Sequence, residues 1–367
     1  MLKEFRVRNF MSFREELVFS LSDDKKYDFN NHLIKNKMIN KAVIIGDNAI
    51  GKSNLGKAVL DLVNHLTDAT ETKVSDGLYV NLFSNDLEAH FSYVFQFGKH
   101  TVCYKYSKMN VKTVTRESLL IDGKEVIRKD YNQVFVKLPG AERLDLDQRN
   151  MMISLVKYVY TSADLDMEYS ENTIFVEFME FVQGMLFATA TDEKTYAGFT
   201  AVGGNLTRLI CKLENGVKDL ELFLKEMGME YKLVEREDVE GPNIYCRFGA
   251  KEILLSRVCS SGTRALIYFY YWYRQKKDIK FLYLDEFDAF YHTKLSQKVL
   301  EMLIGLEDIQ TIVSTHNTDI ISNKILRPDC YFELKEDGLL PFYRRTNKAL
   351  REAHNLQKMY KEGAFDE

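Results

Sequence analysis

The first part of the chain alternates between strand-like and helix-like patterns of hydrophobic residues. Apolar and polar residues alternate over residues 2–8 and 15–21, and an all-apolar run at 41–45 stops at Gly46. Apolar residues at helical spacing then follow from 51 to about 66. A buried strand, a glycine and a helix in direct succession predict a βα unit, so we expect an α/β fold.

The middle of the chain changes character twice. Residues 88–128 are rich in residues that favour strands, and Asp122-Gly123 within them predicts a tight hairpin turn. Residues 141–230 instead carry apolar residues at helical spacing, including one continuous run over 171–188. We therefore predict an antiparallel β segment followed by a helical segment.

The last third of the chain returns to an alternation of strands and helices, which predicts a second α/β portion. The expected elements are strands within 231–255, a helix at 262–276, a strand at 281–284, a helix at 293–306, a strand at 311–314, a helix at 317–324, strands at 331–334 and 340–344, and a charged helix over the last 20 residues.

Composition narrows the classes of protein that this chain can represent. Of 367 residues, 46% are hydrophobic and 28% charged, which excludes bulk disorder. The net charge of −4 argues against a protein that coats nucleic acid by charge alone. The 5 cysteines form no CxxC pair, and we find neither a signal peptide nor an apolar run long enough for a membrane span. We expect a cytoplasmic protein that does not use a membrane.

A phosphate-binding loop is the strongest chemical motif in the sequence. Residues 46–53 satisfy GxxxxGK[ST], with a predicted strand before them and a predicted helix after them. Backbone N–H groups of such a loop cradle phosphates, Lys52 reaches the β and γ phosphates of ATP, and Ser53 holds Mg²⁺. The residues that we expect to bind ATP are Gly46, Asp47, Asn48, Ala49, Gly51, Lys52, Ser53 and Asn54.

Two adjacent acids end the apolar strand predicted at 281–284. A buried parallel strand delivers its last residues to the ligand-binding edge of an α/β sheet. We expect Asp285 to assist Mg²⁺ and Glu286 to orient and polarise the attacking water. Gln96 is a further candidate for the magnesium ion, although a glutamine on a strand face is more often structural.

Several other segments resemble those of known ATPases. Residues 255–263 resemble the signature motif of ABC-type ATPases in its SSGT form, and His316 resembles their switch histidine. Residues 6–13 resemble the N-terminal strand turn of the SMC, RecF and overcoming-lysogenization-defect-like ATPases. Residues 326–329 and 355–365 resemble segments of AAA/ABC-hybrid ATPases in antiphage defence, such as the AriA subunit of the PARIS system.

The resemblance implies an α/β fold, an ABC-type P-loop ATPase head with an antiparallel β subdomain and a helical insertion. It also implies that two heads sandwich ATP, with Glu286 and His316 catalytic. The signature of one chain, which would bind ATP held by the other, is Ser260, Ser261, Gly262 and Thr263. The expected domains are 1–66 (first half of the head, with Walker A), 67–140 (β arm), 141–230 (helical insertion), 231–345 (second half, with signature, Walker B and switch histidine) and 346–367 (C-terminal helix).

The resemblance favours one biological role and leaves one alternative. We expect a sensor or scaffold of an antiphage, abortive-infection system that forms homo-oligomers with ATP. It would respond to a phage protein and control a nuclease or toxin. We expect this effector to be encoded separately because no nuclease motif follows the head. The alternative is a DNA-repair or recombination ATPase of the RecF/Rad50 type, and a local basic patch for DNA remains open.

Overall fold

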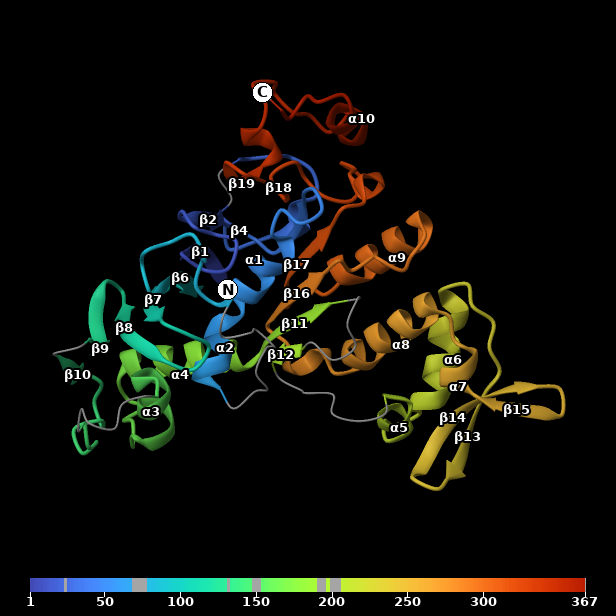
Figure 1. Ribbon diagram of the computed structural model, residues 1–367, viewed down its shortest axis with the longest axis horizontal. Coiled ribbons are helices and arrows are strands. Elements are labelled where there is room, and N and C mark those ends of the chain that lie inside the picture. Colours follow the sequence, from blue (N-terminus) through green and yellow to red (C-terminus); the bar gives the residue numbers. More distant parts are fainter. Residues whose placement is uncertain are drawn as a thin grey trace.

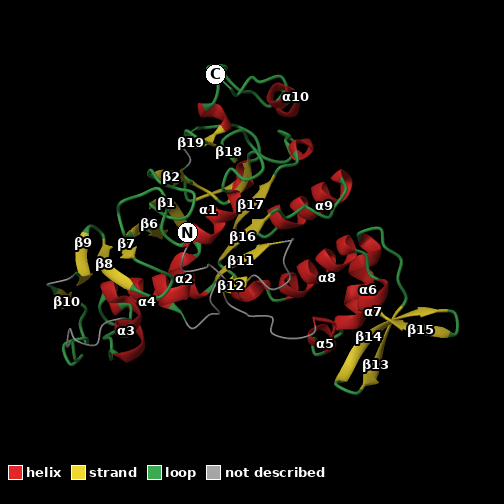
Figure 2. Cartoon of the chain, viewed as in Figure 1, coloured by secondary structure: helices red, strands yellow, loops and turns green. Residues whose placement is uncertain are grey.

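The computed structural model of the chain describes residues 1–22, 25–67, 78–130, 133–146, 153–189, 196–198 and 206–366. Within these ranges the strands form two seven-stranded sheets, a three-stranded sheet and a two-stranded sheet. Figure 1 shows the two large sheets on either side of the helices near the N-terminus, and Figure 2 shows how strands and helices are distributed. The predicted α/β fold class with an antiparallel β part is confirmed.

The central sheet joins distant parts of the chain. β5 (Lys41–Ile45) lies between β17 (Gln310–Thr315) and β18 (Tyr331–Lys335), and β16 (Phe281–Asp285) pairs with the other side of β17. These four strands and β11 (Met185–Thr189), which pairs with β16, run parallel. The antiparallel edge strands are β12 (Tyr196–Gly198) and β19 (Gly338–Pro341).

The outer sheet is antiparallel throughout and has the order β10-β9-β8-β7-β6-β1-β2. Turns at Gly98-Lys99 and at the predicted Asp122-Gly123 connect its hairpins. Buried Gln310 joins it to the central sheet through hydrogen bonds with both backbone groups of Leu2. Its strands are β1 (Leu2–Arg8), β2 (Leu17–Ser20), β6 (Ala89–Phe97), β7 (His100–Lys108), β8 (Val114–Ile121), β9 (Lys124–Lys129) and β10 (Val134–Val136).

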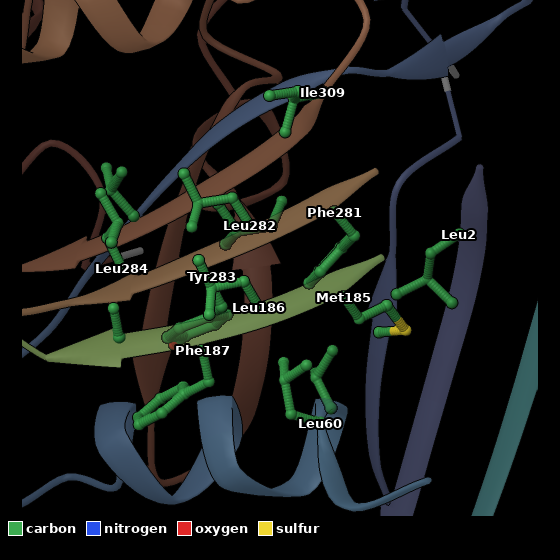
Figure 3. Packing of buried hydrophobic residues seen from close by; sticks show 14 of the residues in the cluster. Leu2, Leu60, Met185, Leu186, Phe187, Phe281, Leu282, Tyr283, Leu284 and Ile309 are labelled. Carbon is green, nitrogen blue, oxygen red and sulfur yellow. The ribbon is translucent and has the colours of Figure 1, made fainter. Parts of the chain in front are cut away.

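Two consecutive helices, α1 (Lys52–Val59) and α2 (Asp61–Leu66), fill the space between the large sheets (Figure 1). On the central side, Gly56 approaches the rings of Phe187 and Tyr283 so closely that a Cβ atom would lie 2.5 and 2.6 Å from them. Figure 3 shows these rings beside Leu60 in the buried core. Because only glycine fits this contact, α1 is held tightly against the central sheet.

On the outer side, polar groups connect the same helices to the antiparallel sheet. The Tyr93 hydroxyl donates to the Ala58 carbonyl at 2.8 Å. The buried ammonium of Lys108 lies 3.0 Å from a carboxylate oxygen of Asp61. The helices that follow the phosphate loop are therefore fixed by both sheets, through shape on one side and through hydrogen bonds and an ion pair on the other.

The other helices cover the remaining surfaces. No helix in the described part of the chain is long and apolar enough to pass through a bilayer. These other helices are α3 (Leu155–Ser162), α4 (Ser170–Gln183), α5 (Leu206–Cys211), α6 (Gly216–Glu226), α7 (Leu255–Val258), α8 (Ser261–Arg274), α9 (Thr293–Ile304), α10 (Leu356–Lys361) and the 3-10 turns Asn31–Leu33, Lys276–Asp278, Thr318–Ile320 and Phe342–Arg344. The small sheets are β3 (Ile34–Lys35) with β4 (Met38–Ile39), and β13 (Leu233–Asp238), β14 (Gly241–Phe248) and β15 (Lys251–Leu254).

The helical prediction over 171–188 is wrong at its end. α4 stops at Gln183, and β11 continues as a fully buried strand of the central sheet. A strand buried on both faces has no alternation, so its apolar residues look like the continuation of a buried helix. The expected insertion at 141–230 is therefore not purely helical, because it contributes β11 to the central sheet.

Two further predicted helices are much shorter than expected. Instead of a helix at 317–324, the structure has the 3-10 turn Thr318–Ile320, in which the Asn317 side chain accepts from the amide of Asp319. Side chains of this type favour local turns over helix. In the expected C-terminal helix at 346–367, only α10 is helical among the described residues.

Candidate functional site

The phosphate-binding loop lies between β5 and α1, as predicted. Two of its residues have left-handed backbone, Ala49 with φ 63° and Gly51 with φ 111°. Gly51 precedes α1 and caps its N-terminus with no side chain, so no side-chain oxygen competes for the first amides of the helix. Uncapped amides at a helix N-terminus attract anions.

Lys52 is folded back into the loop that it belongs to. Its Nζ donates to the carbonyls of Gly46 and Asp47, both at 2.8 Å, and the residue is buried. Burial lowers the pKa of the Lys52 ammonium, while the carboxylates of Glu286 and Asp285 act in the opposite direction. A buried cation that lies near two acids and the backbone amides of a loop is suited to bind a highly charged anion together with a metal ion.

The N-terminal turn supports the loop from outside. The Ser12 hydroxyl accepts from Asn54 Nδ2 at 2.9 Å, and a Cβ atom on Gly51 would lie 2.9 Å from the same hydroxyl. Met11, in the same turn, has left-handed backbone with φ 49°. The expected ATP ligand Asn54 thus ties the loop to residues 9–13, a contact that the sequence motif did not predict.

The two acids at the end of β16 share one buried hydroxyl. Ser314, on neighbouring β17, donates to Asp285 Oδ1 at 2.6 Å and accepts from the amide of Glu286 at 3.0 Å. Glu286 has φ 46°, a conformation that costs a non-glycine residue about 1–3 kcal/mol. Ser314 thus holds both acids in place, and the sequence analysis did not identify it.

The order of the strands brings the motifs to one edge of the sheet. β5 and β16 are separated only by β17, and all three run parallel. The phosphate loop, the acids and His316 follow their carboxyl ends, where ligands bind in such sheets. The side chain of His316 is exposed to solvent.

The turn after the acids is fixed by a second buried carboxylate. Asp288 accepts from the Thr315 hydroxyl at 2.6 Å and from Asn317 Nδ2 at 2.9 Å. These bonds connect the segments on either side of His316 to the turn that follows Glu286. The positions of the two expected catalytic residues are therefore coupled through Asp288.

The expected signature opens α8 and is largely exposed. Ser260 caps the helix by accepting from the amide of Thr263 at 3.1 Å, and Ser260 and Ser261 face solvent. A Cβ atom on Gly262 would lie 2.9 Å from the carbonyl oxygen of Phe290, in the turn after the acids. Thr263 is buried beneath the helix cap, so its side chain has a structural role that the sequence prediction did not assign.

Gln96 does not reach this site. It lies at the hairpin end of β6, where its Nε2 donates to the Gly98 carbonyl at 3.1 Å and its Oε1 accepts from the Thr101 hydroxyl at 3.1 Å. β6 pairs with β1 so that Phe95 is opposite Leu2, at the end of β1 away from the turn that contacts the phosphate loop. The structure thus does not bring Gln96 together with the other expected magnesium ligands, and its amide stabilises a turn instead.

Comparison with known proteins gives one family match. The family model described as "AAA domain, putative AbiEii toxin, Type IV TA system" matches residues 175–322. This segment includes β16, β17 and α8, and it begins after the phosphate loop. The match covers less than half of the chain, so it shows a similarity to this family over that segment. No curated protein sequence matches the chain.

Solved structures of SMC heads have a loosely similar overall shape. The SMC head domain from Thermotoga maritima aligns with a TM-score of 0.44 and 14% identity over 93% of this chain and 98% of that one. The Smc head from Pyrococcus furiosus with an extended coiled coil, bound to the C-terminal domain of ScpA, aligns with a TM-score of 0.46 and 13% identity over 98% of both chains. At such scores the likeness says nothing about the activity of this chain.

Proposed function

We propose that the protein binds and hydrolyses ATP as an ABC-type ATPase. The observation that carries this proposal is the shared edge of the central sheet, where Lys52 lies in the phosphate loop and Ser314 holds Asp285 and Glu286 two strands away. A phosphate cradle alone also occurs in proteins that only bind nucleotides. The adjacent pair of acids adds a group that can activate water.

Each residue of the site has a separate role in this proposal. Lys52 exchanges its two loop carbonyls for the β and γ phosphates, and the amides that open α1 bind the same phosphates. Glu286 orients the attacking water and accepts its proton, and His316 contacts the γ-phosphate from the end of β17. The left-handed backbone of Glu286 directs this side chain independently of Asp285.

The donor groups also fit a magnesium ion. Ser53 follows Lys52 in the first turn of α1, and Asp285 is a buried acid at the neighbouring strand end. Mg²⁺ takes oxygen ligands, commonly one or two from protein together with phosphate and water. When bound, the ion neutralises charge on the β and γ phosphates.

A second copy of the chain completes the site in this proposal. Ser260 and Ser261 are exposed at the start of α8, a helix of 14 residues, and form a second anion-binding end. Gly262 packs against the carbonyl of Phe290, which belongs to the turn that follows the two acids. Two copies related by a twofold axis would place the signature of each copy over the ATP of the other.

The test combines two variants with a matched control. Lys52→Ala should abolish ATP binding, measured with a fluorescent ATP analogue, while Lys57→Ala on the same helix should bind normally. Glu286→Gln should bind ATP without hydrolysing it and form a stable dimer in ATP. Unchanged ATP affinity of Lys52→Ala would show that the phosphate loop is not the ATP-binding site. A Glu286→Gln variant that stays monomeric at saturating ATP would refute the sandwich of two copies.

For the biological role, we propose a sensor or scaffold subunit of an antiphage, abortive-infection system that controls a separate nuclease or toxin. The support is the family description, which names a toxin of a type IV toxin–antitoxin system, and the resemblance of residues 326–329 and 355–365 to defence ATPases. Co-purification with the product of the neighbouring gene, with and without phage infection, tests it. Stimulation of ATP hydrolysis by DNA, without such a partner, would favour the repair alternative.

A further inference from the structure

One loop of the protein exposes four large apolar side chains within ten residues. Leu78, Leu82, Phe83 and Leu87 have exposed fractions of 51%, 70%, 81% and 71%. We call these four residues the apolar loop. Single exposed leucines are common on protein surfaces, whereas several large ones on one short segment indicate an interaction surface.

The backbone of this segment is fixed although its apolar side chains face water. The amide of Phe83 donates to Asn81 Oδ1 at 3.0 Å, and Asn81 Nδ2 donates to the Met11 carbonyl at 2.7 Å. Asn9 Nδ2 donates to the carbonyls of Asp86 and Glu88 at 2.7 and 2.8 Å. The backbone of the loop is therefore held in place before binding, which lowers the entropic cost of binding a partner.

The same bonds place the apolar loop beside the phosphate loop. Residues 9–13 hold the apolar loop through Asn9 and Met11, and they hold the phosphate loop through the bond between Ser12 and Asn54. One turn of five residues thus connects both loops. A partner that covers the phosphate loop would therefore lie next to the turn that holds the apolar loop.

The signature side of the molecule carries a matching feature. Phe290 is 42% exposed, and its carbonyl lies against Gly262 of the signature. Ser260 and Ser261 next to it are exposed as well. If the signature of one copy faces the phosphate loop of another, Phe290 of the first copy approaches the apolar loop of the second.

We propose that the apolar loop is the hydrophobic part of an ATP-dependent interface between two copies of this chain, and that it packs against the signature segment around Phe290 of the second copy. This proposal rests on the sandwich in the proposed function. Phosphate contacts alone bury little surface, and stable interfaces need a desolvated apolar centre with large anchoring side chains. Phe83, the most exposed member, is the expected anchor.

The test introduces serine at Leu82, Phe83 and Leu87 together in the Glu286→Gln chain. The control carries Val239→Ser and Phe248→Ser in the three-stranded sheet, which lies at the other end of the molecule (Figure 1). Sedimentation with ATP should show dimerisation weakened at least about tenfold by the triple change, the effect of about 1.4 kcal/mol. The control should dimerise like its parent, and both should bind the fluorescent ATP analogue normally.

A cross-linking experiment keeps the proposal testable should the triple variant fold poorly. A photoreactive benzoyl-phenylalanine at position 83 of the Glu286→Gln chain should give a covalent dimer in ATP and none in ADP. Its cross-linked peptide should come from residues 257–264 or 287–292 of the second copy. A Glu286→Gln dimer that neither loses affinity on serine substitution nor cross-links there overturns the apolar interface alone. A chain that stays monomeric in ATP overturns the sandwich and this interface with it.

Discussion

Replacement of Ser314 by alanine tests whether one buried hydroxyl organises the two acids at the end of β16. The change removes the 2.6 Å bond to Asp285 and leaves the amide of Glu286 without its acceptor. A hydrogen bond to a charged group contributes about 1.5–3 kcal/mol and one between neutral groups about 0.5–1.5 kcal/mol. The free energy of unfolding should therefore fall by about 2–4 kcal/mol, as measured by urea denaturation.

The effect on catalysis should differ from the effect on binding. Glu286 keeps its left-handed backbone partly through the bond to Ser314, so its carboxylate should lose its fixed position. We expect kcat for ATP hydrolysis to fall at least about tenfold, the equivalent of about 1.4 kcal/mol in the activation barrier. The Kd for ATP should change little, because the contacts of Lys52 do not involve Ser314.

A matched serine separates this effect from the general cost of losing a buried hydroxyl. Ser296 is equally buried, on α9, but its hydroxyl donates only to the carbonyl of His292 at 3.3 Å. Ser296→Ala should lower the free energy of unfolding by about 1 kcal/mol and leave kcat unchanged. Equal losses of stability in the two variants, or a normal kcat in Ser314→Ala, would refute the reasoning.

Three further changes test other contacts. Gly56→Ala should destabilise the fold by about 1–3 kcal/mol because its methyl group meets two rings, whereas Gly305→Ala, with no atom closer than 3.5 Å, should be tolerated in the same denaturation assay. Gly51→Ala should weaken ATP binding, measured by calorimetry, since position 51 has φ 111° and faces Ser12. Burial lowers the pKa of Lys41 to about 7 in the folded protein. Between pH 7 and 10 the unfolded chain therefore binds more protons at this residue than the folded protein does, and the free energy of unfolding should rise with pH. Lys41→Met should remove this rise in pH-dependent melts.

The candidate nucleotide site was largely predictable because its signals are local. The phosphate loop needs glycines, a lysine and a serine at fixed spacing, and the acids at 285 and 286 follow a short apolar strand. Both lie where the sequence placed them, at one edge of the central sheet. The supporting roles of Ser12 and Ser314 could not be predicted, because each acts on a residue far away in sequence and a single serine has no distinctive pattern.

The errors have physical causes that can be named. β11 was predicted as helix because a strand with both faces buried carries no alternation, and its pairing with β16 is set by residues almost a hundred positions later. Gln96 was considered a ligand because it is a glutamine in a strand that follows the phosphate-loop helix, and only the register of β6 against β1 shows that it lies at the end of the strand away from the site. Tertiary pairing, which a single sequence does not display, decided both cases.

The strand order of the central sheet also determines when the protein can acquire its site during synthesis. β5, which carries the phosphate loop, is flanked by β17 and β18, so its two neighbours are made almost three hundred residues after it. Until residue 315 has left the ribosome, both edges of this apolar strand lack their native partners, and one edge still lacks its partner until residue 335 has followed. Such delayed long-range pairing slows folding and exposes nascent chains to aggregation. The sheet that carries the phosphate loop can therefore be completed only after β18 has been made, and until then the nascent chain should depend on chaperones.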